Sequence, residues 1–357
     1  MQVSFKKTSM VKYARGNKSL TIYRAYTLSE KKLSIVHVGN GDIDPFFMRN
    51  FSSFGTLCLL ATFCLMLISG CSKKEPIPPA QQKKASVQAL TIGLVPEQNI
   101  FTQFDRYEPL VRYLSKKAGV PITLKALDSY NDVINDFAAL KLDGAFFGSF
   151  TYAVAHSTIG VEAIARPELL DGRSTYHGYI FARRDSGIKT AADMKGKRFA
   201  FVNRSTTAGY LYPMIYFKEH GISDPNKYLG EVYFTGTHSD TIYDVLNGKA
   251  DIGAAKNSIY DKLAGKDARI RNDLLLLAKS KDVPENGLAL RKDIAGEIRD
   301  RLKGALLGMD TDPEGIIVLR FFGARRFIET KNEDYNAVYD YAGTLGMDLS
   351  KYDSLDR

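Results

Sequence analysis

The sequence has 357 residues, of which 45% are hydrophobic and 25% are charged, a composition typical of a globular protein with a large core. The formal net charge of +9 is uneven: residues 1–70 hold nine Lys or Arg and three Asp or Glu, a net +6, which leaves +3 for the remainder. So small an excess, without a basic and aromatic patch, argues against nucleic acid as a partner.

An export signal is predicted over residues 48–70. A Met-Arg-Asn start at Met48 precedes an uncharged run from Phe51 to Ile68, and small residues then lead to Cys71. A basic start, an apolar stretch and small residues before the cleavage point define such signals. The Ile-Ser-Gly-Cys ending resembles a bacterial lipobox, which implies lipidation of Cys71. An uncleaved membrane helix is the alternative, because the run is just long enough to span a bilayer.

The segments that flank this signal are predicted to lie outside the folded protein. Residues 1–47 show no sustained periodicity, so we interpret them as a spurious or disordered extension. Residues 71–87 combine proline, glutamine and lysine without apolar spacing and predict a flexible tether. A mature chain from Cys71 holds a single thiol and therefore forms no internal disulfide.

From residue 88 onward, short apolar runs alternate with amphipathic stretches. This alternation predicts an α/β lobe with a parallel sheet. The predicted strands cover residues 89–96, 122–126 and 144–147, and the predicted helices cover residues 107–117 and 131–140, with a third helix near Ser149.

A similar helix–turn–strand unit recurs later in the chain at one constant offset, which suggests a second lobe of like construction. The matching residues are Asp132, Ile134, Asp136, Lys141 and Asp143 with Asp240, Ile242, Asp244, Lys249 and Asp251. The second lobe is predicted to contain strands at 197–202, 231–235 and 251–255 and a helix at 240–246.

Two crossings between the lobes are predicted, at residues 176–182 and 283–290. They divide the folded chain into lobe 1 (88–178), lobe 2 (179–283) and a return to lobe 1 (284–357). Helices over 294–307 and 313–328 and a polar tail belong to the return. Two crossings produce a hinge and a cleft, the arrangement in which binding proteins close on a ligand.

A turn of small hydroxylated residues follows the strand at 197–202. Ser205, Thr206 and Thr207 precede a helix, where the first N–H groups have no carbonyl partner. These donors, the helix dipole and the hydroxyls favour an oxyanion. The alternative is that Ser205 or Thr206 only caps the helix.

His238 follows a strand and precedes a helix, at the sheet edge where ligands bind in open α/β folds. A surface or core histidine without a ligand is the alternative. Tyr130 and Tyr176 occupy comparable places in lobe 1 and at the crossing, and a half-buried ring is equally compatible with them.

Enzyme chemistry is the weaker prediction. The histidines are scattered without metal-ligand spacing, and no nucleotide phosphate loop is present, so neither a metal nor a cofactor is expected. A hydrolase built from Ser205, His238 and Asp240 remains an alternative.

Over most of Leu90–Arg326, the sequence resembles the phosphonate/phosphate/phosphite-binding periplasmic subunits of ABC importers. The motifs that carry the resemblance are the S-T-T-A-G-Y-L-Y-P run at Ser205–Pro213, His238 after Gly-Thr, the N-G-K-A-D strand entry and the P-x-x-x-x-x-x-R-K-D return at Pro284–Asp293. The resemblance implies a two-lobed type II binding-protein fold, each lobe a mainly parallel sheet with flanking helices, and two crossover strands as the hinge.

The resemblance also implies the ligand-binding residues. Thr206, Thr207 and Ala208 correspond to the family's Ser-Thr-Ser turn, His238 to its histidine, and Tyr130 and Tyr176 to its tyrosines. Ala208 lacks the third hydroxyl, for which Ser205 compensates from one residue earlier.

The acids that pair a ligand ammonium in some family members align with Ser258 and Asn286, which are neutral. A desolvated ammonium without a carboxylate is costly. We therefore expect little affinity for aminoethylphosphonate and favour phosphate, phosphite or a simple alkyl phosphonate.

The function implied is that of a lipid-anchored, monomeric solute-binding protein that delivers an oxyanion to an inner-membrane permease and its ATPase. A sensing lipoprotein that signals to a receptor kinase is an alternative with the same fold.

Overall fold

The computed structural model describes residues 8–15, 18–25, 89–130, 132–139 and 141–352. The predicted signal peptide, Cys71 and the tether lie outside these residues. The chain divides into two units, Met1–Ala80 and Gln81–Arg357. Within the described ranges, no helix combines the length and the apolar character that a membrane span requires.

The first unit contains two antiparallel strands, β1 (Thr8–Arg15) and β2 (Lys18–Ala25). Both strands lie within residues 1–47, for which no strand was predicted from the sequence. In β1 and β2, polar and apolar residues partly alternate, which is the two-residue period of a strand.

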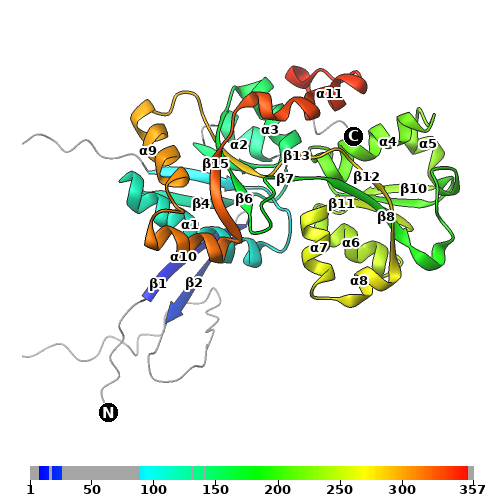
Figure 1. Ribbon diagram of the computed structural model, residues 1–357, viewed down its shortest axis with the longest axis horizontal. Helices are drawn as coiled ribbons and strands as arrows, with labels where there is room; N and C mark the ends of the chain where they lie inside the picture. The colour runs from blue at the N-terminus through cyan, green and yellow to red at the C-terminus, as the bar shows by residue number, and fades with distance from the viewer. Residues whose placement is uncertain (1–7, 16–17, 26–88, 131, 140, 353–357) are drawn as a thin grey trace, which may run out of the picture. The chain divides into compact units, whose positions relative to one another are not determined.

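The second unit contains a six-stranded sheet in the order β15-β6-β14-β5-β3-β4 (Figure 1). Its strands are β3 (Leu90–Leu94), β4 (Ile122–Ala126), β5 (Gly144–Phe147), β6 (Glu162–Leu169), β14 (Gly287–Leu290) and β15 (Ala324–Glu329). Its helices are α1 (Ile100–Ala118), α2 (Asp132–Ala138), α3 (Ser149–Ile159), α9 (Gly296–Leu307), α10 (Pro313–Phe322) and α11 (Asn336–Thr344).

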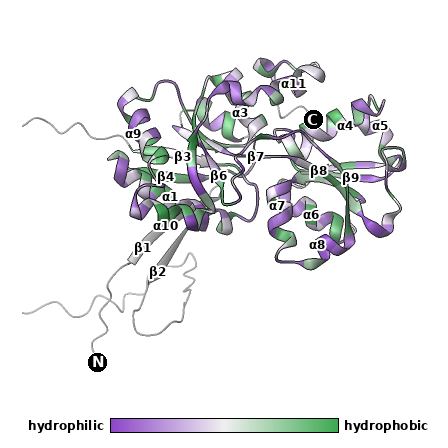
Figure 2. Cartoon of the chain, in the orientation of Figure 1, coloured by the Kyte–Doolittle hydropathy of each residue, from purple (hydrophilic) through white to green (hydrophobic). Residues whose placement is uncertain are grey.

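Helices cover both faces of this sheet because its central strands are apolar on both sides. In β5, Phe146 packs with the residues of α1, α9 and α10, whereas Ala145 and Phe147 pack with those of α2 and α3. Figure 2 shows hydrophobic and hydrophilic residues alternating along the helices, as expected for elements with one buried side.

A five-stranded sheet follows, in the order β10-β9-β11-β8-β12. Its strands are β8 (Gly178–Arg183), β9 (Arg198–Phe201), β10 (Glu231–Phe234), β11 (Ile252–Lys256) and β12 (Leu274–Lys279). Its helices are α4 (Tyr212–Glu219), α5 (Pro225–Tyr228), α6 (His238–Leu246), α7 (Asn257–Ala264) and α8 (Ala268–Asp273), and a π-helical turn (Thr207–Leu211) leads into α4.

Both sheets are mixed rather than mainly parallel. β10, β9 and β11 run parallel, as do β5, β3 and β4, and these are the strands connected by helices. β8 is antiparallel to β11 and β12, and β14 is antiparallel to β5 and β6. β8 and β14 each follow a crossing strand directly, without an intervening helix. Because no helix returns the chain to the other end of the sheet, these two strands run antiparallel to their neighbours.

The two crossings pair with each other. β7 (Thr175–Tyr176) and β13 (Val283–Pro284) form a short antiparallel ribbon in which Tyr176 lies opposite Val283. The chain passes from the six-stranded sheet to the five-stranded sheet at β7 and returns at β13 (Figure 1).

The recurring unit forms the same contacts twice. Asp136 pairs with Lys141 at 3.8 Å, and Asp244 pairs with Lys249 at 3.0 Å. Asp143 accepts a hydrogen bond from the Thr91 amide at 2.8 Å, and Asp251 accepts one from the Arg198 amide at 2.9 Å. The prediction of two helix–turn–strand units is confirmed, and in both units the aspartate at the strand entry ties it to a neighbouring strand.

Two helix predictions were inaccurate by more than one turn. α1 begins at Ile100 rather than at residue 107, because Asn99 caps it by accepting from the amides of Phe101 and Thr102. The predicted helix over 313–328 ends at Phe322, since Gly323 adopts a left-handed conformation (φ 87°) and the chain continues as β15.

Candidate functional site

The hydroxyl turn lies between the end of β9 and the π-helical turn that leads into α4. Ser205, Thr206 and Thr207 are buried, each at 4% exposure or less. Thr206 occupies the N-cap position but does not cap the helix with its side chain. Its hydroxyl donates to the carbonyl of Asn203 at 2.6 Å. The alternative that Thr206 only caps the helix is therefore wrong.

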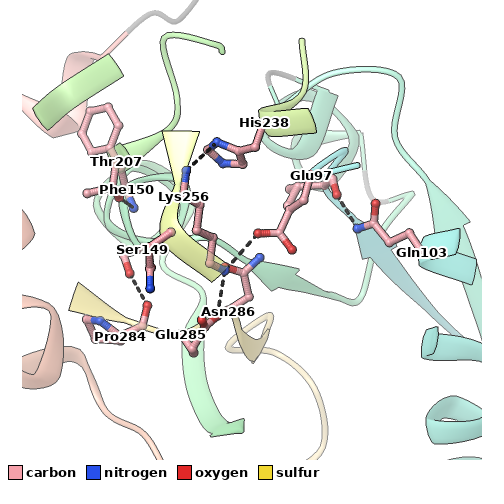
Figure 3. Close-up of polar contacts among 12 residues, drawn as sticks. Glu97, Gln103, Ser149, Phe150, Thr207, His238, Lys256, Pro284, Glu285 and Asn286 are labelled. Atoms are coloured by element: carbon pink, nitrogen blue, oxygen red, sulfur yellow. Dashed lines mark hydrogen bonds and ion pairs between the residues drawn. The ribbon is translucent and has the colours of Figure 1, made fainter. Parts of the chain in front are cut away.

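Thr207 connects this turn to the other lobe. Its Oγ1 accepts a hydrogen bond from the Phe150 amide at 2.9 Å, in the first turn of α3 (Figure 3). The N-cap of α3 is Gly148, which has no side chain to offer. Thr151 in the same turn donates to the carbonyl of Ser205 at 2.8 Å. The hydroxyl turn thus meets the positive end of the α3 dipole.

Ala208 and Gly209 fit this turn closely against the sheets. Ala208 is 1% exposed, and a Cβ on Gly178 would lie 3.0 Å from its Cα. A Cβ on Gly209 would lie 2.4 Å from Val202 Cγ2. Side-chain size is therefore restricted at Gly178 and at Gly209.

His238 is the first residue of α6, two residues earlier than the helix start predicted at Asp240. Thr237 is its N-cap and accepts from the Asp240 amide at 3.0 Å. The Nδ1 atom of His238 accepts a hydrogen bond from the Lys256 amide at 3.2 Å. The proton of the neutral ring is therefore on Nε2, which makes this atom a donor.

Burial lowers the pKa of His238 to about 3, with a further contribution from Lys256. The ring is therefore neutral at physiological pH. Its backbone amide donates to the carbonyl of Glu97 at 3.1 Å, which ties α6 to the segment after β3. His238 is thus a neutral, buried donor held by both lobes.

The structure does not assemble the hydrolase triad. In such a triad the histidine donates Nδ1–H to a carboxylate, whereas Nδ1 of His238 accepts a backbone hydrogen bond. Asp240 is exposed, and a ring with a pKa of about 3 is a weak general base. The Ser205, His238 and Asp240 arrangement does not have the geometry of hydrolysis.

Sequence reasoning missed Lys256, together with its partners Glu97 and Glu285. It ends β11 and is 3% exposed, and its Nζ lies 2.7 Å from Glu285, 3.0 Å from Glu97 and 3.0 Å from Asn286 Oδ1 (Figure 3). The same Nζ lies 4.3 Å from the ring centroid of Tyr176. A lysine directly after the apolar strand residues 252–255 was the signal in the sequence.

The charge of Lys256 is fixed by its neighbours. Burial acts to lower the pKa of its ammonium, but Glu285 and Glu97 outweigh this effect and raise the pKa above its ordinary value. A fixed positive charge therefore lies beside Asn286, one of the two positions that the sequence aligns with ligand-pairing acids. Glu285 precedes Asn286 directly, and Glu97 comes from the segment between β3 and α1.

Two of the predicted residues have polar atoms that no other described group pairs. Tyr130 is 2% exposed and Asn286 is 4% exposed. Neither the Tyr130 hydroxyl nor the Asn286 Nδ2 finds a hydrogen-bond partner in the described part of the chain. Burial raises the pKa of Tyr130 well above its ordinary value, so its hydroxyl keeps its proton. Both groups are donors of the kind that an anion satisfies.

Tyr176 joins the hydroxyl turn to Lys256. Its side chain interacts by hydrogen bonding with Thr207 and Ser149, and its ring contacts the Lys256 ammonium. Lys256 therefore contacts three of the predicted residues directly, which are Tyr176, His238 and Asn286. It is connected to Thr207 through Tyr176. Within the described ranges, no hydrogen bond joins the Tyr130 hydroxyl to this set, although Glu97 and Tyr176 both raise its pKa further.

A cavity of about 410 Å³ borders this network, lined by Lys256, Glu97 and Glu285 together with Arg106 and Lys262. Ser258 also lines it. The other predicted ligand residues are buried at 4% exposure or less and are not among the residues that line this cavity. Among the residues that the structure describes, His, Cys, Asp and Glu form no cluster able to hold a metal ion.

Comparison with known proteins places these features in context. A family model described as "ABC transporter, phosphonate, periplasmic substrate-binding protein" matches residues 92–335. The phosphate-import protein PhnD of Mycolicibacterium smegmatis is 26% identical over 68% of this chain and 78% of its own length. A probable ABC transporter phosphite-binding protein, PhnD1 of Prochlorococcus marinus, is 22% identical over 74% of this chain and 91% of its own length.

Solved structures share the fold. A binding protein component of an ABC phosphonate transporter from Pseudomonas aeruginosa has a TM-score of 0.67 at 19% identity, covering 72% of this chain and 86% of the other. PhnD1 of Prochlorococcus marinus, solved with methylphosphonate, has a TM-score of 0.65 at 20% identity, covering 72% of this chain and 98% of the other.

Proposed function

The chain belongs to the family of periplasmic substrate-binding proteins of phosphonate ABC transporters, and from this premise we propose that it captures a small phosphorus oxyanion. Phosphate, phosphite and simple alkyl phosphonates are the ligands of this class. The fold is the two-lobed α/β arrangement of type II binding proteins, in which closure around a ligand depends on two crossings.

The observation that carries the proposal is the state of His238. Because its Nδ1 accepts from Lys256, its Nε2–H is a donor, and because its pKa is about 3, the ring donates without a charge. Charge-assisted hydrogen bonds to an oxyanion contribute about 1.5–3 kcal/mol each.

Three further donors support the binding of an anion. The Phe150 amide at the start of α3 now donates to Thr207, and an oxyanion oxygen is a stronger acceptor than a hydroxyl. The Tyr130 hydroxyl and the Asn286 amide are buried donors without a partner in the described residues. An oxyanion that accepts from these groups satisfies them, and neutral donors need no additional cation.

Lipid anchoring and delivery complete the proposal. Cys71 carries the anchor, and the loaded monomer delivers its ligand to an inner-membrane permease and its ATPase. This rests on the sequence around residues 48–71 and on the family. Replacing Cys71 by serine should abolish incorporation of labelled palmitate in cells, whereas Cys58→Ser should not.

Titration calorimetry of the purified protein with phosphate, phosphite and methylphosphonate tests the ligand proposal. We expect His238→Ala and Thr207→Val to weaken binding at least tenfold, because each loses about one charge-assisted hydrogen bond. His220→Ala is the matched control, since His220 lies at the opposite end of α4 from the hydroxyl turn. A folded protein that binds none of the three ligands would contradict the proposal.

A further inference from the structure

The groups around the Lys256 ammonium together form a receptor for a cation. Carboxylates of Glu285 and Glu97 lie 2.7 and 3.0 Å from Nζ, the carbonyl oxygen of Asn286 lies at 3.0 Å, and the Tyr176 ring centroid lies at 4.3 Å. Carboxylates and an aromatic face are the partners that an ammonium ion prefers in a dry site. We call these four residues the ammonium cage.

The protein supplies the cation of this cage itself. In the described part of the chain, Lys256 is the only ion-pair partner of Glu97 and of Glu285. Arg106 and Lys262 line the adjoining cavity, but they donate hydrogen bonds elsewhere. Arg106 donates to the Phe322 carbonyl, and Lys262 donates to the side chain of Gln98. Without the Lys256 ammonium, two buried carboxylates would remain without a positive partner.

The Lys256 side chain runs from the proposed oxyanion donors to the cage. At one end, its backbone amide donates to His238. At the other end, its Nζ lies among the cage residues, and Glu97, Glu285 and Lys256 itself all line the adjoining cavity. An amine joined to a phosphonate by a short carbon chain would need this same path.

We propose that Lys256 determines ligand specificity by occupying the ammonium cage with its own side chain, so that phosphonates bearing an amine are excluded and simple oxyanions are admitted. The proposal rests on the proposed function for the phosphorus group and extends it to the rest of the ligand. It also changes the reason why we expect little affinity for aminoethylphosphonate. Carboxylates are present at the site, but Lys256 already pairs with them.

Shortening the lysine tests this proposal. Lys256→Ala removes three methylenes and the amine, which leaves room for an aminoethyl group beside both carboxylates. Lys256→Met is the matched control, because it removes the charge but keeps the cage filled. The ligands are 2-aminoethylphosphonate and propylphosphonate, which have similar lengths and differ in the amine.

The expected result is a reversal of preference. Wild type should bind propylphosphonate at least tenfold more tightly than 2-aminoethylphosphonate, and Lys256→Ala should bind 2-aminoethylphosphonate at least tenfold more tightly than propylphosphonate. Lys256→Met should show no gain for the amine. Equal preference in wild type and Lys256→Ala, or an equal gain in Lys256→Met, would overturn the proposal.

A second readout does not need the phosphorus group. Ethylammonium chloride should raise the melting temperature of Lys256→Ala relative to equimolar sodium chloride, and it should leave wild type and Lys256→Met unchanged. If Lys256→Ala fails to fold, the Lys256→Ala/Glu97→Gln variant keeps a single cage carboxylate and should show the same effect with a smaller shift.

The two readouts separate the two proposals. A wild type that binds no phosphorus ligand would contradict the proposed function, while a stabilising effect of ethylammonium on Lys256→Ala would still support the cage. Absence of that effect in a folded variant would overturn the cage even if wild type binds phosphite or methylphosphonate.

Discussion

Lys256 and His238 share one hydrogen bond yet respond to burial in opposite ways. The ammonium of Lys256 stays charged because two carboxylates face it, whereas burial, together with the nearby charge of Lys256, keeps the ring of His238 neutral. A buried charge is retained where a partner offsets its desolvation, and otherwise it is neutralised. Of these two neighbours, Lys256 is therefore a fixed cation and His238 a neutral donor.

Breaking the cage should destabilise the protein in a way that depends on which charge is removed. Lys256→Met leaves two buried carboxylates unpaired and should lower the free energy of unfolding by roughly 3–5 kcal/mol. Glu285→Gln should cost less, because the pair between Lys256 and Glu97 remains. Urea unfolding of both variants and of the Lys256→Met/Glu285→Gln double variant measures these free energies. A double variant less stable than Lys256→Met would contradict the account.

The pKa of His238 also predicts how stability changes with pH. Because the folded value of about 3 lies below the ordinary value of 6.5, the unfolded chain binds the proton more tightly. This contribution to stability is complete above about pH 6.5 and is lost as the pH falls toward 3. The slope approaches about 1.4 kcal/mol per pH unit for a single group.

The His238→Gln variant isolates the contribution of His238 to this pH dependence of stability. We expect its free energy of unfolding to fall less than that of wild type between about pH 6.5 and pH 5, by roughly 1–2 kcal/mol. Other titrating groups are common to both proteins and cancel in the difference. Parallel curves for the two proteins would show that His238 titrates normally.

At the scale of elements, the sequence was informative wherever local chemistry fixes the chain. The strand, hydroxyl turn and helix at 197–219 were predicted because an apolar run, a cluster of hydroxyls and an amphipathic stretch follow one another. The end of α10 was missed although Gly323 is a standard helix stop, because the apolar residues Ala324, Phe327 and Ile328 recur after it at helical spacing.

Gly209 is the point where the hydroxyl turn depends most on packing. A Cβ there would lie 2.4 and 2.5 Å from Val202, whose branched side chain has little freedom to move. Gly209→Ala should therefore cost about 1–3 kcal/mol of stability and displace the turn, with weaker oxyanion binding.

Gly304→Ala is the matched control for this change. Gly304 lies within α9, and a Cβ there meets nothing within 4 Å. The substitution should raise stability by about 0.5–1 kcal/mol, because alanine loses less conformational entropy in a helix. Thermal unfolding and calorimetry of both variants test the pair; equal effects would mean that the contact with Val202 carries no cost.

At the scale of the whole molecule, the recurring unit and the two crossings allowed the lobes to be predicted from the sequence. The ammonium cage could not be predicted from the sequence, because Lys256 is separated in the chain by 159 positions from Glu97 and by 29 positions from Glu285. Motif reading selected Thr207 and His238 as site candidates, because each of them lies in a local pattern. It missed the lysine and both glutamates, whose roles depend on how the lobes meet.

A crystal structure of the protein with phosphite or methylphosphonate tests the central claim most directly. The account predicts oxyanion oxygens about 2.7–3.2 Å from His238 Nε2 and from the amides at the start of α3, with Lys256 still among the cage residues. An oxyanion bound instead by Arg106 and Lys262 in the adjoining cavity, without contact to His238 or Thr207, would contradict it.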